Sequence, residues 1–279
     1  MNDRDVLRGL AARWMELASQ PVMAERARRW TNLKDLQPEK PMILFETWSL
    51  LHYVADDELE CTDSANRGLE WTMRSVIRHA DEVGDDIVVE PVWRVEWRVL
   101  CSDYGVPLNT TSAEDVLGDH VAYHYDHPIR TPEDIARLKP RRWSVDRPGT
   151  LREVERLEAL FGDILPVRLH GTTALHAGLT GDLFRLLGND NLMTWVIDQP
   201  EVIHRVMAYL RDDRMAYFRW LESEGLLGLN NNSTLVGSGS PGYTTALPQP
   251  DYAGKPRLKD VWVWMESQEC AGISPRMFA

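Results

Sequence analysis

Several apolar segments of this 279-residue chain end in side chains that could bind a substrate or transfer a proton. The residues at these ends are Glu46, Glu90, His170, Asn231 and the run Glu266, Ser267, Gln268 and Glu269. Carboxylates that share a partly dry pocket can act as a general acid, a general base or metal ligands. Polar groups that follow neighbouring parallel strands meet at one edge of a sheet, so we expect these side chains to share one pocket.

The roles expected at this pocket differ by residue type. We predict Glu90, His170 and Glu266 as catalytic groups, and the others as substrate-binding groups. The substrate-binding set comprises Glu46, Asn231, Ser267 and Gln268, with Trp48 and Trp93 as apolar walls. The alternative is structural: each Glu could be solvated or pair with a cation such as Arg94 or Arg168, and His170 could bond a backbone carbonyl.

The elements that must position these residues alternate between strands and helices. Short apolar runs at 41–48, 85–93 and 164–170 predict strands, and helical periodicity predicts helices at 66–82, 151–162 and 181–224. Further strands are expected at GLLGLNNN and VWVWMES. Strand–helix–strand spacing is typical of a doubly wound sheet or a (β/α)8 barrel, and no Gly-rich dinucleotide fingerprint is present. We therefore predict an α/β barrel over 41–279, preceded by a helical extension over 1–40.

Composition restricts the class of partner. The formal charge of −12 argues against nucleic acid or an anionic membrane surface, because both select for basic patches. Three cysteines without paired spacing give no disulfide framework or closed zinc site, and no run of eighteen uncharged apolar residues occurs. We expect a cytoplasmic protein whose main partner is a small molecule or another protein.

Two other groups could carry chemistry but fit no motif. DHVAYHYDHP offers His120, His124 and His127, yet this spacing matches no standard zinc motif. Cys270 follows Glu269, and a neighbouring carboxylate disfavours the thiolate, so Cys270 is expected to be an inert packing residue. Neither group is therefore assigned to a metal ion.

Several segments, taken in order, resemble the uroporphyrinogen decarboxylase-like superfamily, in particular its corrinoid-dependent methyltransferase branch. The segments are KPMILFETW, DDIVVEPVW, DHPIRTPEDIARLKP, LPVRLHGTTALHAGLTGDLFRLLG, MTWVIDQPEVIHRVMAYLRDD and MESQECAGISPRMF. The resemblance implies a (β/α)8 barrel with its substrate at the C-terminal face of the strands. It also implies zinc, with ligands expected beyond residue 279, and a corrinoid carried by a partner protein. About five of eight barrel strands can be counted, so we expect a C-terminally truncated, incomplete barrel. A second subunit, as in a homodimer, would cover its open edge.

The same resemblance argues against porphyrinogen as the substrate. True uroporphyrinogen decarboxylases carry an Arg-rich turn after the first strand and an Asp after the second, whereas this chain has FETWS and Glu90. A tetra-anionic substrate needs those cations. We expect methyl transfer between a small methylated substrate and a corrinoid protein. The alternatives are a decarboxylase of a small acid and a non-catalytic binding or assembly fragment.

Overall fold

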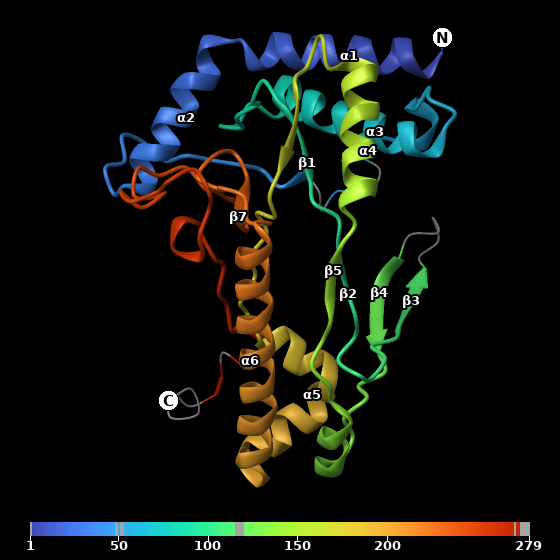
Figure 1. Ribbon diagram of the computed structural model, residues 1–279, viewed down its shortest axis with the longest axis vertical. Helices are drawn as coiled ribbons and strands as arrows, with labels where there is room; N and C mark the ends of the chain where they lie inside the picture. Colours follow the sequence, from blue (N-terminus) through green and yellow to red (C-terminus); the bar gives the residue numbers. More distant parts are fainter. Residues whose placement is uncertain (1, 48–49, 51–52, 115–119, 271, 274–279) are drawn as a thin grey trace. The chain divides into compact units, whose positions relative to one another are not determined.

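A computed structural model describes residues 2–47, 50, 53–114, 120–270 and 272–273 of the chain. The chain divides into two compact units, whose elements can be followed in Figure 1. The first unit comprises Met1–Arg98, Asp146–Ala174 and Gly225–Trp262, and the second comprises Val99–Val145, Leu175–Glu224 and Val263–Ala279. Each unit has its own cluster of buried apolar side chains.

The first unit contains the N-terminal helices and a parallel strand pair. Its helices are α1 (Asp3–Ala18), α2 (Pro21–Lys34), η2 (Asp56–Glu58), α3 (Ser64–Arg78), the π-helical turn η3 (His79–Val83), α4 (Arg147–Phe161) and η5 (Leu258–Asp260). Its strands are β1 (Trp93–Glu96), β6 (Val167–His170), β7 (Leu235–Gly237) and β8 (Ser240–Pro241). Asn2 caps α1 and Asp63 caps α3, since each side chain accepts hydrogen bonds from N–H groups of the first turn.

The apolar face of α1 packs against α3 and α4, and α4 packs against β6. Leu7 and Ala11 of α1 are fully buried, as are Met73 of α3 and Phe161 of α4. Figure 1 shows α1 lying across α3. Burying a side chain of this size stabilises the fold by about 1.5–3 kcal/mol. The helices therefore form one packed layer against β1 and β6.

Strands β1 and β6 pair in parallel, with Trp93 opposite Val167 and Glu96 opposite His170. Helix α4 precedes β6 and packs against it, as expected for a strand–helix–strand crossover. A further parallel bridge joins Thr172 to Leu227. The predicted strand at 164–170 is thus confirmed over its last four residues.

The strands expected at 41–48 and 85–93 are absent over their described residues, except that Trp93 is the first residue of β1. Asp86 and Asp85 accept hydrogen bonds from the backbone N–H groups of Ile43 and Phe45, at 2.9 and 2.7 Å. The two carboxylates thus accept backbone N–H groups that would otherwise bond a neighbouring strand, and Pro91 has no N–H group to donate to one. Strand β1 consequently begins at Trp93, so Glu90 precedes a strand instead of ending one.

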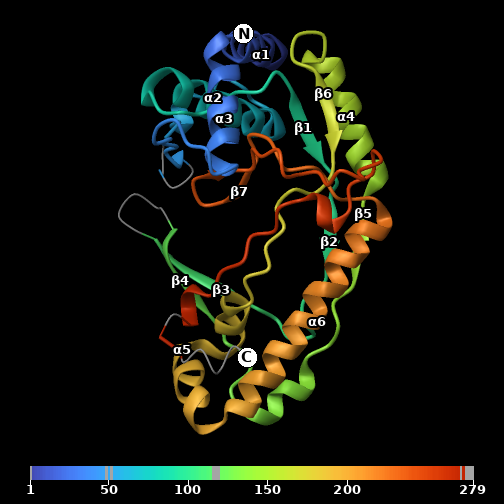
Figure 2. The same ribbon diagram turned by 90° about the vertical axis from the view of Figure 1, so that its left-hand side faces the viewer.

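The second unit combines short antiparallel strands with two long helices, α5 and α6, visible in Figure 2. Its elements are β2 (Val99–Cys101), β3 (Thr110–Glu114), β4 (His120–Tyr125), η4 (Pro132–Arg137), β5 (Trp143–Val145), α5 (Thr180–Asp198), α6 (Pro200–Glu224) and η6 (Gln268–Cys270). Strand β2 pairs with β5, and β3 with β4. Helix α5 breaks at Gly188, whose φ of 74° suits glycine, and a Cβ there would lie 2.9 Å from the His127 ring.

The α/β class is confirmed, but the described residues form separate two-stranded sheets and no closed barrel. The segments predicted as the last two strands each contribute a single parallel bridge, at Leu227 and Trp264. A barrel requires every strand to pair on both edges, and these bridges are too short for that. The division at residue 40 remains a prediction. No helix among the described residues is both long enough and apolar enough to cross a membrane.

Candidate functional site

A cavity of about 410 Å³ lies within the first unit. Its apolar wall includes the rings of Trp14, Phe45 and Trp93. Its polar lining includes Glu46, His79, Glu90, Arg94 and Ser233. Cavities of this size, mostly apolar with a few convergent polar groups, are typical of small-molecule sites. Of the sequence-predicted residues, Glu46, Glu90 and Trp93 meet here.

Glu90 is held as a carboxylate by donors from three directions. Its side chain pairs with Arg94 and accepts hydrogen bonds from Ser233 N–H and Tyr243 Oη–H, both at 3.0 Å. Burial alone would raise the pKa of Glu90. The hydrogen bond and the charge of Arg94, together with the hydrogen bonds from Ser233 and Tyr243, outweigh burial and hold this pKa below its usual range. Glu90 is therefore ionised at neutral pH and suits the role of anchor or acceptor better than that of proton donor.

Glu46, on the segment that precedes η2, forms hydrogen bonds with the loop between β7 and β8. Its Oε1 accepts from Gly239 N–H at 2.5 Å, and its Oε2 lies 3.5 Å from the Ser238 hydroxyl. Trp93 packs edge-on against Trp14, with ring centroids 5.7 Å apart. Trp14 Nε1–H also donates to the backbone carbonyl of Glu90 at 2.8 Å. The cavity wall is thus fixed by α1 as well as by β1.

The carboxyl end of the β1–β6 pair carries a second polar group. His170 Nε2 lies 3.1 Å from the Leu229 carbonyl, and burial together with the charge of Arg94 lowers its pKa. Opposite His170, Glu96 accepts from the Thr173 hydroxyl at 2.5 Å. Sequence reasoning missed Glu96 because it ended the strand at residue 93. The alternation of WRVEW was the signal that could have extended the strand to this carboxylate.

Asn231 is committed to the backbone, since its Nδ2–H donates to the Leu247 carbonyl at 2.9 Å. The neighbouring Asn230 is the buried one, and it bridges Thr173 and Trp262 through hydrogen bonds to both backbones. His170 and Asn231 are not among the described residues that line the cavity. Their predicted roles remain untested.

Glu266, Ser267 and Gln268 belong to the second unit. Glu266 lies 3.5 Å from His176 Nε2, and the His176 ring lies 4.7 Å from that of Trp264. The Ser267 carbonyl accepts from Cys270 N–H at 3.0 Å, and Gln268 begins the turn η6. Nothing in the sequence marks His176 beyond its place in the segment TALHAG.

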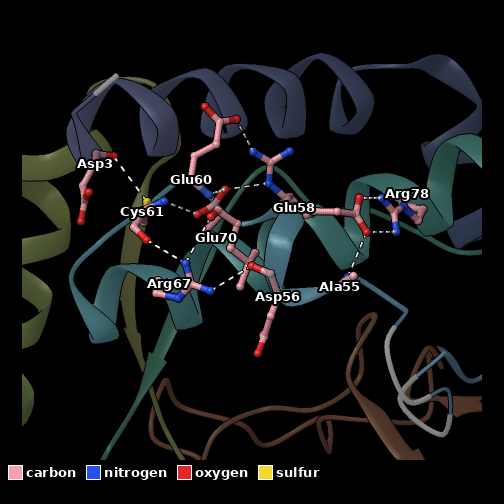
Figure 3. Close-up of polar contacts among 11 residues, drawn as sticks. Asp3, Ala55, Asp56, Glu58, Glu60, Cys61, Arg67, Glu70 and Arg78 are labelled. Atoms are coloured by element: carbon pink, nitrogen blue, oxygen red, sulfur yellow. Dashed lines mark hydrogen bonds and ion pairs between the residues drawn. The ribbon is translucent and has the colours of Figure 1, made fainter. Parts of the chain in front are cut away.

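A network of carboxylates and arginines fixes the turn 55–63 against α1 and α3 (Figure 3). The Glu70 carboxylate is fully buried and accepts from the backbone N–H groups of Glu60 and Cys61, at 3.0 and 2.8 Å. Arg67 donates to backbone carbonyls of this turn. Burial and the Glu70 carboxylate raise the pKa of the Cys61 thiol to about 12, which makes it unreactive. The network therefore supports α3, whose residues line the cavity.

The remaining predicted groups give no metal site in the described part of the chain. No cluster of at least three His, Cys, Asp or Glu side chains that could hold a metal ion occurs there. Cys270 is buried, and burial raises its pKa, in agreement with the expected packing role. Trp48 lies outside the described residues.

Two curated proteins resemble part of this chain. The uroporphyrinogen decarboxylases of Mycobacterium sp. (strain KMS) and Mycobacterium sp. (strain JLS) are each 27% identical to it over 151 residues. The match covers 53% of this chain and 42% of each relative, so less than half of each relative's length is matched. No family model matches the chain. No solved structure matches it significantly.

Proposed function

We propose that this chain is part of an enzyme of the uroporphyrinogen decarboxylase superfamily, and that the cavity of the first unit binds its substrate. The two similar uroporphyrinogen decarboxylases and the ordered segments quoted above support the superfamily. The proposed reaction moves a methyl group between a small methylated substrate and a corrinoid held by a partner protein.

The charge of the cavity is the observation that carries the proposal. Glu46 and Glu90 supply carboxylates, and Arg94 is the only Lys or Arg among the described residues that line the cavity. Because Arg94 already pairs with Glu90, no unbalanced cation is left for an anionic ligand. A neutral or cationic molecule with an apolar methyl group fits this lining better than a polyacid.

Each lining residue has a proposed task. The rings of Trp14 and Trp93 would pack against the methyl group, and Glu46 would accept a hydrogen bond from the substrate. Glu90 would hold Arg94 in place and orient the polar end of the substrate. Zinc does not fit the described residues, since they provide no cluster of ligands, and no step is assigned to it. His170, Gln268 and Glu266 remain candidates outside this cavity.

Decarboxylation of a small acid is the second candidate, because both similar relatives are named as decarboxylases. It would require Arg94 to leave Glu90 and bind the substrate carboxylate. Arg98 follows Arg94 in the sequence, and its side chain is 70% exposed beside Asp146. Arg168 lies opposite Arg94 in the β1–β6 register. This second reaction therefore needs a rearrangement that methyl transfer does not.

Ligand charge separates the two candidates. Methylammonium, methanol and acetate would be titrated into the purified chain while the indole N–H signals of Trp14 and Trp93 are followed by NMR. Methyl transfer predicts that methylammonium or methanol binds at least about tenfold more tightly than acetate, and that Glu46→Gln weakens methylammonium binding. Tighter acetate binding would favour decarboxylation, and binding of none of the three would favour the non-catalytic alternative.

Turnover is tested directly with free cob(I)alamin as methyl acceptor and methylammonium or methanol as donor. The formation of methylcobalamin changes the visible spectrum, so the rate can be followed continuously. The matched control is Glu16→Gln, which changes an exposed carboxylate of α1. The proposal predicts that this control has the wild-type rate and that Glu46→Gln is slower.

A further inference from the structure

We propose that His79, held by Asp85, is the proton-transfer residue of the cavity. The inference rests on the proposed function, because it requires the cavity of the first unit to hold the substrate. His79 has no role predicted from the sequence, since it falls within the helix predicted at 66–82 and follows no strand. The structure places it at the end of α3, where it lines the same cavity as Glu46 and Glu90.

The pair of side chains is buried and close. His79 Nε2 lies 2.7 Å from Asp85 Oδ2, and the two side chains are 6% and 4% exposed. The π-helical turn η3 begins at His79, and Gly84, with a φ of 73°, reverses the chain so that Asp85 returns to the ring. Glycine adopts this left-handed conformation without a Cβ penalty. The local sequence HADEVGD therefore builds the pair within one turn.

The other contacts of Asp85 determine the tautomer of His79. Asp85 Oδ2 also accepts from Phe45 N–H at 2.7 Å, and its Oδ1 accepts from Ile87 N–H at 3.0 Å. A carboxyl group that receives these backbone donors acts as an ionised acceptor, so His79 Nε2 must carry the hydrogen it donates. In neutral His79 the lone pair then lies on Nδ1, which is the nitrogen left for a ligand. This arrangement matches that of a carboxylate that orients a catalytic histidine.

Both candidate reactions need a proton at the substrate. In methyl transfer from methanol to the corrinoid, the oxygen that loses its methyl group keeps the electron pair of the broken bond and takes up one proton, whereas the nitrogen of methylammonium already carries that proton. In decarboxylation, the carbon that loses CO₂ keeps the electron pair and takes up one proton. The imidazolium of His79 would release that proton from Nδ1, with the N–H electron pair remaining on the ring. Asp85 stabilises the positive charge before the transfer.

Glu90 cannot easily take this role. Its pKa is lowered by Arg94, Ser233 and Tyr243 against the effect of burial, so it carries no proton to give at neutral pH. His170 has its Nε2 beside the Leu229 carbonyl and is not among the described residues that line the cavity. Of the titratable groups described in the cavity lining, His79 is thus the one whose geometry suits reversible protonation.

The test uses ¹⁵N-histidine NMR of the whole chain, with the His79 ring assigned from its loss in His79→Gln. Neutral His79 is expected as the Nε2–H tautomer. On titration with methylammonium, the His79 Nδ1 signal and the indole signals of Trp14 and Trp93 are expected to shift together. A His79 ring in the Nδ1–H tautomer would overturn the inference without any ligand, since Nδ1 could not then accept a proton.

Variants separate this inference from the proposed function. The Gln side chain can keep an N–H donor for Asp85 while it removes Nδ1, so His79→Gln is expected to keep the fold, to bind methylammonium at least tenfold more weakly and to slow methyl transfer from methanol about a hundredfold. His204→Gln, on the exposed face of α6, should behave as wild type. If the indoles shift with unchanged affinity and rate in His79→Gln, the inference fails while the cavity remains the site. If no signal shifts in the wild type, the proposed function fails as well.

Discussion

Each unit of the molecule contains a histidine beside a carboxylate, and the two pairs differ in depth and in distance. His79 and Asp85 are buried and 2.7 Å apart, whereas His176 and Glu266 are 37% and 22% exposed and 3.5 Å apart. Asp85 comes from the turn that follows His79, and backbone donors hold its carboxylate. Glu266 comes from a distant part of the sequence, and buried His176 Nε2 forms no hydrogen bond with the described residues. A pair built within one turn is therefore fixed locally, while the other depends on tertiary packing.

The largest predicted effect is the loss of the Asp85 carboxylate. Asp85→Ala leaves the buried His79 and two part-buried N–H groups without their acceptor, so the free energy of unfolding should fall by about 3–5 kcal/mol. Urea unfolding of the purified variant measures this. Asp81→Ala removes an exposed carboxylate of the same turn and is the matched control. Equal losses of unfolding free energy in the two variants would show that the buried Asp85 carboxylate stabilises the protein no more than the exposed one.

The next largest effect on stability is expected for Glu70 of the first unit, and this effect should depend on pH in the acid range. Burial raises the pKa of Glu70, but N–H donors from Glu60 and Cys61 and the side chain of Arg74 together bring it below its usual value near 4.5. A lowered folded-state pKa stabilises the protein above the unfolded value, and this contribution disappears as pH falls through the folded value. Glu70→Gln should cost about 2 kcal/mol at pH 7 and progressively less below about pH 4. Urea midpoints across this range test the sign, with Glu16→Gln as an exposed control. A cost that grew in acid would contradict the assignment.

A substitution beside the second pair should have a smaller effect. A Cβ on Gly178 would lie 2.8 Å from His176 Nε2 and 3.0 Å from the Glu266 carbonyl oxygen. Gly178→Ala is expected to cost about 1–2 kcal/mol, because one flexible side chain must move and the backbone must yield. Gly68→Ala, within α3 and with nothing inside 4 Å of its Cβ, should instead stabilise by up to about 1 kcal/mol. Thermal melting of both variants gives the comparison, and opposite signs are the expected result.

The smallest effect is expected for Glu266→Gln. An ion pair of this exposure and length contributes less than about 1 kcal/mol. The urea midpoint should hardly change, in contrast to Asp85→Ala. A loss as large as that of Asp85→Ala would mean that the second pair also supports its unit.

The sequence predicted what depends on local pattern. Helices α3, α4 and α6 follow apolar periodicity and capping residues, and the strand that ends at His170 follows a short apolar run. The strands predicted at 41–48 and 85–93 were wrong over their described residues except Trp93, because the carboxylates of Asp85 and Asp86 bond the backbone there. Side-chain acceptors that replace a ladder leave no period in the sequence.

The site was predicted in part for the same reason. Glu46, Glu90 and Trp93 do line one cavity, although Glu90 precedes its strand. The pairing of Glu90 with Arg94 was foreseen only as an alternative to a catalytic role. His79 was missed because a residue that ends a helix resembles any helical residue until its partner is known. Its partner lies six positions later, across a glycine turn that periodicity does not describe.

The indole of Trp14 has a consequence for how this chain can be shortened. Trp14 lies in the segment predicted as an extension, yet its ring lines the cavity and its N–H donates to the Glu90 carbonyl. A version that starts at Pro41 would remove one wall of the cavity and expose the apolar faces of α3 and α4 that α1 covers. We expect such a version to fold only when residues 2–40 are supplied as a separate peptide.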